Sequence, residues 1–153
     1  MGKIKSMNIT FGYSCNNNCI HCLIGEDERN RVRDRTTEEV KKEILKAKEL
    51  DVEQIIFIGG EVTIRKDYFE LLEFASKNGM KVHLETNGRM FAIDSFARKT
   101  FEIMPDLDIA MSFHHPKKEI QDRITRAKGS FNQSVKGIKN MKKYGLKHLT
   151  VIP

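Results

Sequence analysis

A short, continuous apolar run, QIIFIGG at residues 54–60, ends on two glycines. A strand that is apolar at every position is covered on both faces, which is typical of parallel sheets. Further segments of strand composition occupy residues 7–13, 81–88, 107–113 and 148–153, and helical patterns separate them. This alternation predicts an α/β protein with about five strands in one parallel sheet, joined by right-handed crossovers.

The helical segments carry recognisable ends. Residues 36–50 open with a capping box, Thr36 followed by Glu39, and continue with apolar residues at helical spacing. Further helices are predicted over 68–78, 95–104 and 131–144, with Asp67, Asp94 and Ser130 as their N-caps. The charged stretch at 25–34 is predicted to be a connecting loop.

The composition narrows the class of protein. The chain has 153 residues, 39% hydrophobic and 31% charged, which suits one soluble domain. It contains neither an apolar run of the roughly 20 residues that span a membrane nor a secretory leader, so we expect a cytoplasmic protein. The net charge is +6, but basic and acidic residues are interspersed, and no stacking aromatics accompany them. Nucleic-acid binding is therefore unlikely as a function, and NRVRDR at 30–35 is interpreted as a solvated loop.

The polar motifs of the chain follow the predicted strands. The cysteines come after the first strand, Gly59–Glu61 after the second, Thr86–Gly88 after the third and Ser112–His115 after the fourth. Loops at the carboxyl ends of parallel strands build the sites of such folds. The sequence therefore predicts one site at this edge of the sheet.

All three cysteines lie within CNNNCIHC, at residues 15–22. Their odd number, in a chain without an export leader, argues against disulfides. Zinc remains an alternative, with His21, His114 or His115 completing the ligand set. A cubane iron–sulfur cluster is held by cysteine thiolates, and three of them would leave one iron open to a substrate or cofactor. An electron carrier would instead be expected to have a fourth cysteine.

The spacing Cys15-x₃-Cys19-x₂-Cys22 after a first strand resembles the radical S-adenosylmethionine (SAM) superfamily. Here His21 stands where that family usually has an aromatic residue. Gly59–Glu61 resembles the family's motif for the amino group of SAM, although Val62 replaces the common proline. Thr86–Gly88 matches the third strand end, and the resemblance extends in order over nearly all of the chain.

The resemblance implies a partial (βα) barrel with about five of six strands, and one core domain over residues 1–153 that is incomplete at its C-terminal end. It implies an oxygen-sensitive enzyme in which Cys15, Cys19 and Cys22 bind a [4Fe–4S] cluster and SAM chelates the open iron. Reductive cleavage of SAM then gives a 5′-deoxyadenosyl radical that abstracts hydrogen from an unknown substrate. The electron donor would be a ferredoxin or flavodoxin, and the 124–145 region favours peptide modification or cofactor biosynthesis.

The resemblance also assigns residues to SAM. Gly59 and Gly60 would let backbone carbonyls approach its amino group, while His21 would lie against the adenine. The remaining expected SAM contacts are Glu61, Thr86, Asn87, Ser112 and Arg126, the last preferred over Arg123 for the SAM carboxylate. His114 stands where many relatives have an acidic residue near the ribose.

Two further expectations stand beside the radical SAM enzyme. A non-catalytic iron–sulfur or zinc-binding module is the alternative function. In addition, a chain that ends on a strand with nothing packed after it suggests the first part of a longer protein or a shortened form of one, which could lack activity.

Overall fold

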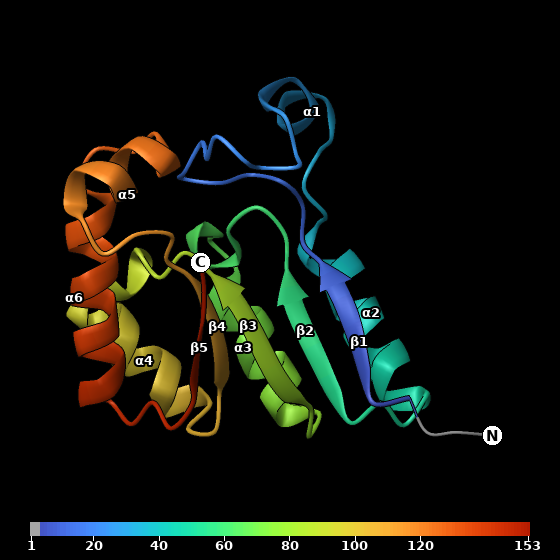
Figure 1. Ribbon diagram of the computed structural model, residues 1–153. Helices are drawn as coiled ribbons and strands as arrows, with labels where there is room; N and C mark the ends of the chain where they lie inside the picture. Colours follow the sequence, from blue (N-terminus) through green and yellow to red (C-terminus); the bar gives the residue numbers. More distant parts are fainter. Residues whose placement is uncertain (1–3) are drawn as a thin grey trace.

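Five parallel strands form one sheet in the computed structural model, which describes residues 4–153 (Figure 1). Their order in the sheet follows the chain, from β1 at one edge to β5 at the other. The strands are β1 (Ser6–Thr10), β2 (Gln54–Ile58), β3 (Lys81–Thr86), β4 (Asp108–Ser112) and β5 (Leu149–Ile152). The predicted α/β class, the strand number and the parallel pairing are confirmed.

Helices connect each strand to the next. They are α1 (Glu26–Arg31), α2 (Thr37–Glu49), η1 (Val62–Ile64), α3 (Tyr68–Lys77), η2 (Met90–Ala92), α4 (Asp94–Ile103), α5 (Lys118–Thr125) and α6 (Ser130–Lys143). The prediction of a loop over residues 25–34 was wrong in part, because α1 occupies most of it. That segment is rich in glutamate and arginine, residues of high helix propensity.

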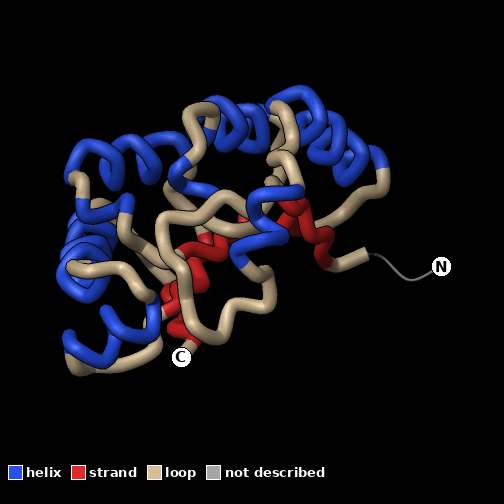
Figure 2. The backbone as a smooth tube through the Cα atoms, turned by 90° about the horizontal axis from the view of Figure 1, so that it is seen from above, coloured by secondary structure: helices blue, strands red, loops and turns tan. Residues whose placement is uncertain are grey.

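One face of the sheet carries the core. A row of apolar residues crosses it in register, Ile9, Phe57, Leu84, Ile109 and Leu149, and the first four are almost fully buried. Figure 1 shows α2, α3 and α4 behind this face, and Figure 2 shows the helices along one side of the strands. Burial of this row drives the packing of helices on sheet.

The opposite face of the sheet is more open. Ile55 and Phe57 of β2 are completely buried, whereas Ile56 and Ile58, which alternate with them, are only half-buried. The expectation that β2 is covered on both faces is therefore corrected. Ile58 on this second face lines the cavity described below, which is why its side chain stays partly accessible.

The capping box of α2 is confirmed, since Thr36 and Glu39 exchange side-chain and backbone hydrogen bonds. Asp67 stands at the N-cap of α3 as predicted, but its side chain makes no capping bond and instead accepts from Arg65 and Thr37. The predictions for Asp94 and Ser130 were wrong, because both are already helical residues. Their side chains bond to other residues, Asp94 to Lys143 and Ser130 to Asp122.

All strands point toward one edge of the sheet, the carboxyl edge. In Figure 1 this edge faces upward, and α1, α5 and the loop after β1 lie over it. In the part of the chain that the structure describes, no helix combines the length and hydrophobicity needed to cross a membrane. The carboxyl edge is where the predicted site residues gather.

Candidate functional site

A cavity of about 510 Å³ opens at the carboxyl edge, and we call it the main cavity. Such a volume suits a cofactor or small ligand. Most of the residues predicted to form the site line it, namely Cys15, Cys19, Cys22, His21, Gly59, Gly60, Thr86, Asn87 and Ser112. These residues come from the ends of four strands and are far apart in the sequence, so the fold brings them together.

The loop after β1, residues 11–25, carries the three cysteines and is called the cysteine loop. All three thiols are free, and Cys15 and Cys19 are half-buried while Cys22 is exposed. The Cys15 sulfur accepts a hydrogen bond from the backbone of Asn17 at 3.3 Å. The loop therefore presents its thiols at the main cavity without any covalent link between them.

Backbone hydrogen bonds hold the cysteine loop at its start. The carboxylate of Asp34 accepts from the backbone N–H groups of Tyr13 and Ser14 at 2.8 and 3.2 Å. The N–H of Gly60 donates to the Gly12 carbonyl, and the N–H of Glu61 donates to the Ser14 carbonyl. The beginning of the loop is thus joined to the end of β2 as well as to Asp34.

The middle of the loop is held by the end of α5. The N–H groups of Asn18 and Ile20 donate to the carbonyls of Thr125 and Ile124, each at 2.9 Å. The last carbonyls of a helix have no partner within the helix. Here the cysteine loop supplies donors for two of them, which fixes its position relative to α5.

Two arginines hold the loop from its sides. Arg29 of α1 donates to the carbonyls of Asn17 and Ile24, at 2.8 and 3.3 Å. Arg89 donates to the Asn16 carbonyl and, at 2.6 Å, to the Asn17 side chain. The asparagines between the cysteines therefore accept hydrogen bonds from arginines, a role that sequence analysis did not assign to them.

Burial raises the pKa of both the Cys15 and the Cys19 thiols. The positive charge of Arg29 opposes this rise in each case, and the backbone N–H of Asn17 does so at Cys15. A thiol must lose its proton before it can bind a metal. Metal loading of this loop would accordingly release protons.

Gly59 and Gly60 pack directly against the cysteine loop. A Cβ on Gly59 would lie 2.5 Å from the Gly12 carbonyl oxygen, and one on Gly60 would lie 2.3 Å from that of Ser14. Both positions exclude any side chain, because the contacts are with backbone that cannot move aside. The structure thus gives these glycines a role in the close approach of two backbones.

Glu61 does not line the main cavity but lies beneath it, 3% exposed. Its carboxylate accepts from the Thr63 backbone and hydroxyl, from the Thr86 hydroxyl at 2.7 Å and from the Asn87 N–H at 2.6 Å. Burial raises the pKa of this carboxyl, and these donors oppose the rise. Glu61 ties the end of β2 to the end of β3.

Thr86 and Asn87 are buried and make several hydrogen bonds within the protein. The Thr86 hydroxyl also accepts from the Gly88 N–H, and the Asn87 amide donates to the Asn16 side chain at 2.7 Å. Gly88 has φ +75°, the left-handed turn that glycine adopts without strain. This turn therefore connects the third strand end to the cysteine loop.

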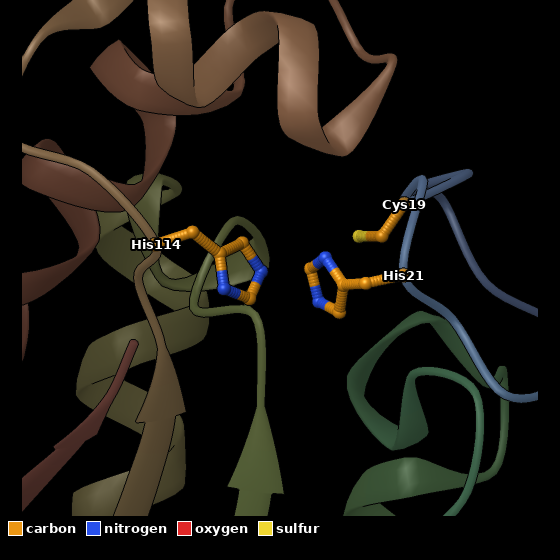
Figure 3. A group of neighbouring side chains, drawn as sticks. All are labelled: Cys19, His21 and His114. Atoms are coloured by element: carbon orange, nitrogen blue, oxygen red, sulfur yellow. The ribbon is translucent and has the colours of Figure 1, made fainter.

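His21, Cys19 and His114 lie close together on one side of the main cavity (Figure 3). Their ligand atoms are all within 4.8 Å of one another, and the two imidazole rings meet edge to face at 4.4 Å. Burial, with the neighbouring His21, lowers the pKa of His114. His115 points elsewhere, since its ring nitrogen accepts from the Lys117 N–H.

Arg126 is placed apart from the other predicted residues. It lines a second hollow of about 420 Å³ together with Arg29 and the Asn16–Asn18 segment, and it does not line the main cavity. Its backbone has φ +49° at the C-cap of α5. The structure therefore brings together ten of the eleven predicted residues, with Glu61 beneath the cavity floor, and leaves Arg126 on the far side of Cys15.

Sequence analysis missed Arg29, Arg89 and Asp34, which position the cysteine loop. Nothing local in the sequence distinguishes these residues from surface charges. Glu85 was also missed, although the alternation of KVHLET places it opposite Val82 and Leu84 and so on the cavity side.

The chain is similar to proteins of a known family. A family model described as the radical SAM superfamily matches residues 9–153. The mycofactocin maturase MftC of Mycolicibacterium smegmatis is 29% identical over 133 residues, which cover 87% of this chain and 33% of that protein. The Fe-coproporphyrin III synthase of Methanosarcina barkeri is 30% identical over 133 residues, with the same coverage of both chains. The chain spans about one third of the length of these curated relatives.

Solved structures share the fold. SuiB of Streptococcus suis bound to S-adenosylmethionine superposes with a TM-score of 0.74 at 16% identity, over 97% of this chain and 32% of SuiB. The structure named native anSMEcpe with bound AdoMet gives the same TM-score at 20% identity and covers 97% of this chain and 43% of that one.

Proposed function

This chain belongs to the radical SAM superfamily, and we propose that it binds a [4Fe–4S] cluster and SAM at the carboxyl edge of its sheet and starts hydrogen-atom abstraction from a substrate. Within that proposal, residues 1–153 belong to one radical SAM core domain. The observation that carries the proposal is the convergence of three free thiols and three strand-end motifs on the main cavity.

The donor set fits a cubane cluster. Thiolates are the protein ligands that such clusters use. In the described part of the chain, the one set of three potential ligand atoms within 4.8 Å of one another is Cys19, His21 and His114. The three thiols together are spread more widely than that, which suits a group with several irons better than a single ion.

When bound, the reduced cluster would supply the electron that cleaves SAM to methionine and a 5′-deoxyadenosyl radical. The protein's part is to position and shield these groups. Cys15 and Cys19 are held half-buried by the contacts of the cysteine loop, while Gly59 and Gly60 bring the end of β2 against that loop. Asp34, Arg29 and Arg89 hold the loop backbone through contacts of the protein itself.

We assign the SAM contacts to the rest of the cavity wall. Backbone atoms of Gly59 and Gly60 receive the amino group, His21 lies along the adenine, and Ser112 contacts the ribose or carboxylate. Thr86 and Asn87 shape the wall between them, and Glu61 holds that wall from beneath. Arg126 would reach the SAM carboxylate only by extending from the second hollow, so we rank it below the others.

The substrate is proposed to be a peptide or a cofactor precursor. Relatives with a maturase name and a porphyrin-synthase name support these two classes, and SuiB is described bound to the precursor peptide SuiA. The electron would come from a ferredoxin or flavodoxin in the cytoplasm.

The test is anaerobic reconstitution of the full chain with iron and sulfide. We would then add SAM and a strong chemical reductant and measure 5′-deoxyadenosine by mass spectrometry. The control is the triple variant Cys15→Ala, Cys19→Ala, Cys22→Ala. Product from the wild type alone is the expected result, and equal product from both proteins would overturn the proposal.

One observation favours a second candidate, a zinc-binding module without catalysis. Cys19, His21 and His114 already offer one thiol and two imidazoles at single-ion spacing (Figure 3). These are ligands that zinc accepts. Stoichiometric zinc that survives reconstitution, together with absence of an iron–sulfur absorption band, would favour this candidate over the enzyme.

A further inference from the structure

Glu85 lies in β3 on the open face of the sheet. Its neighbours in the strand, Leu84 and Thr86, are buried on the helix side, so the Glu85 side chain points the other way. It is half-buried and lines the same main cavity as the three cysteines. A carboxylate thus projects into the space between the sheet and the cysteine loop.

The residues around Glu85 offer it no positive charge. Ala110 faces it in register on β4, and Thr150 follows on β5. Ile58 and Thr10 form the same row on the other side and also line the cavity. Among the described residues the Glu85 carboxylate has no hydrogen-bond or ion-pair partner, and Ala110, which faces it, has no polar side-chain group to offer.

Asp108, the next acidic residue on the same face of the sheet, does have a partner. It lies one row below Glu85 and pairs with His83 at 2.7 Å. Arg29, the one arginine or lysine that lines the main cavity in the described chain, already donates to Asn17 and Ile24. The protein therefore provides a partner for Asp108 but leaves Glu85 without one.

A half-buried carboxylate without a partner loses part of its hydration and gains nothing in exchange. It is stabilised when a cation or a strong donor enters the cavity, and a charge-assisted hydrogen bond is stronger there than in water. An unpaired carboxylate at a ligand-sized cavity therefore favours a partner that comes from outside the chain.

We propose that Glu85 is the recognition residue for a cationic group, an ammonium or guanidinium, on the substrate. This inference rests on the proposed function, because it takes the main cavity as the place where the substrate meets SAM. It narrows the substrate to molecules that carry such a cation near the position of hydrogen abstraction.

The test compares the reconstituted wild type with Glu85→Gln and with a matched control, Glu102→Gln. Glu102 is an exposed carboxylate on α4, away from the cavity. Equilibrium dialysis in the presence of SAM measures the binding of agmatine, with neutral n-butanol as the reference probe, and a separate dialysis measures SAM itself. Thermal unfolding checks that all three proteins are folded.

We expect Glu85→Gln to weaken agmatine binding by about tenfold or more, since a hydrogen-bonded charge pair is lost. SAM affinity should stay within about twofold, and Glu102→Gln should change neither value. Glu85→Asp should retain part of the agmatine affinity.

Three results would overturn the inference. The first is equal binding of agmatine to wild type and Glu85→Gln, and the second is agmatine binding no tighter than that of n-butanol. The third is a fall in SAM affinity of about tenfold in Glu85→Gln, which would make Glu85 part of the SAM site instead. Failure of the proposed function would appear differently, as absence of cluster and SAM binding in the wild type, and a repeat of the agmatine dialysis on cluster-free protein would still test Glu85.

Discussion

The two halves of the carboxyl edge are built in opposite ways. At the ends of β1, β2 and β3, Glu61 joins two strand ends and Arg89 reaches across to the cysteine loop. At the end of β4, the Ser112 hydroxyl has no hydrogen-bond partner among the described residues. The difference shows that side-chain hydrogen bonds gather at the half that carries the three cysteines proposed as cluster ligands, while the Ser112 hydroxyl stays available to a ligand.

The largest loss of stability should come from removing the Glu61 carboxylate, which lies at the centre of the first half. Glu61→Ala would leave the Thr63 and Thr86 hydroxyls and the Asn87 N–H buried without an acceptor. We expect the free energy of unfolding to fall by about 3 kcal/mol or more, measured by urea unfolding followed by circular dichroism. Glu102→Ala on exposed α4 is the control, and a loss below about 1 kcal/mol for Glu61→Ala would contradict the prediction.

A smaller but more local effect should follow from Arg89→Ala. The cysteine loop would lose its contacts at Asn16 and Asn17 but keep those at Asp34. We expect iron retention after reconstitution to weaken by about tenfold, as for other residues that orient metal ligands. Iron content during stepwise chelation measures this, with exposed Arg98→Ala as the matched control. Equal retention in both variants would show that Arg89 is not a positioning residue.

Acid should weaken the same half through Asp34. Burial opposes ionisation, but hydrogen bonds from Ser14 and Tyr13, with Arg65 nearby, hold the pKa of Asp34 below its usual value. A depressed pKa in the folded state means that the stabilisation is present above the unfolded value of about 3.9 and is lost as pH falls through the folded pKa.

The comparison with Asp34→Asn isolates that charge from the other carboxylates. At neutral pH the variant should be about 1 kcal/mol less stable than wild type, and the gap should close as pH falls below about 4. Urea unfolding across this pH range measures the gap. A gap that is constant with pH would assign the stabilisation to something other than the Asp34 charge.

The smallest effect is expected in the second half. Ser112→Ala removes a hydroxyl that has no partner in the described protein, so the free energy of unfolding should change by less than about 0.5 kcal/mol. SAM affinity should fall two- to fivefold, or about 0.4–1 kcal/mol, if the hydroxyl contacts SAM as proposed. A large loss of stability would show that the Ser112 hydroxyl has a structural role, as the polar side chains of the first half do.

Much of the site's location followed from the sequence, because polar motifs after parallel strands converge at one edge of a sheet. The cysteines, Gly59–Gly60 and Thr86–Asn87 were all placed at the main cavity in this way. Their contacts were less predictable. Gly59 and Gly60 were expected to serve a ligand, yet their missing side chains make room for Gly12 and Ser14, a contact between segments distant in the sequence.

The residues that sequence analysis missed share one property. Asp34, Arg29 and Arg89 act through backbone carbonyls and amides of the cysteine loop, and backbone groups leave no trace in a sequence pattern. The helices α1 and α5 were missed because each is short and strongly charged. Arg126 was predicted to belong to the site but lies apart from it, because its position at the C-terminal end of α5 says nothing about the side of the cysteine loop on which it lies.

The contacts that hold the cysteine loop become available in a fixed order while the chain is synthesised. The loop leaves the ribosome before α5, because the α5 carbonyls that hold Asn18 and Ile20 come more than a hundred residues later in the chain. The Ser134 hydroxyl, which donates to the Asn87 carbonyl, follows still later. At a synthesis rate of about 5–20 residues per second, on the order of ten seconds would pass between the emergence of the thiols and that of the residues that hold the loop. During that interval the loop lacks its contacts with α5, so a cluster bound after the emergence of α6 would meet the loop with all of its contacts available.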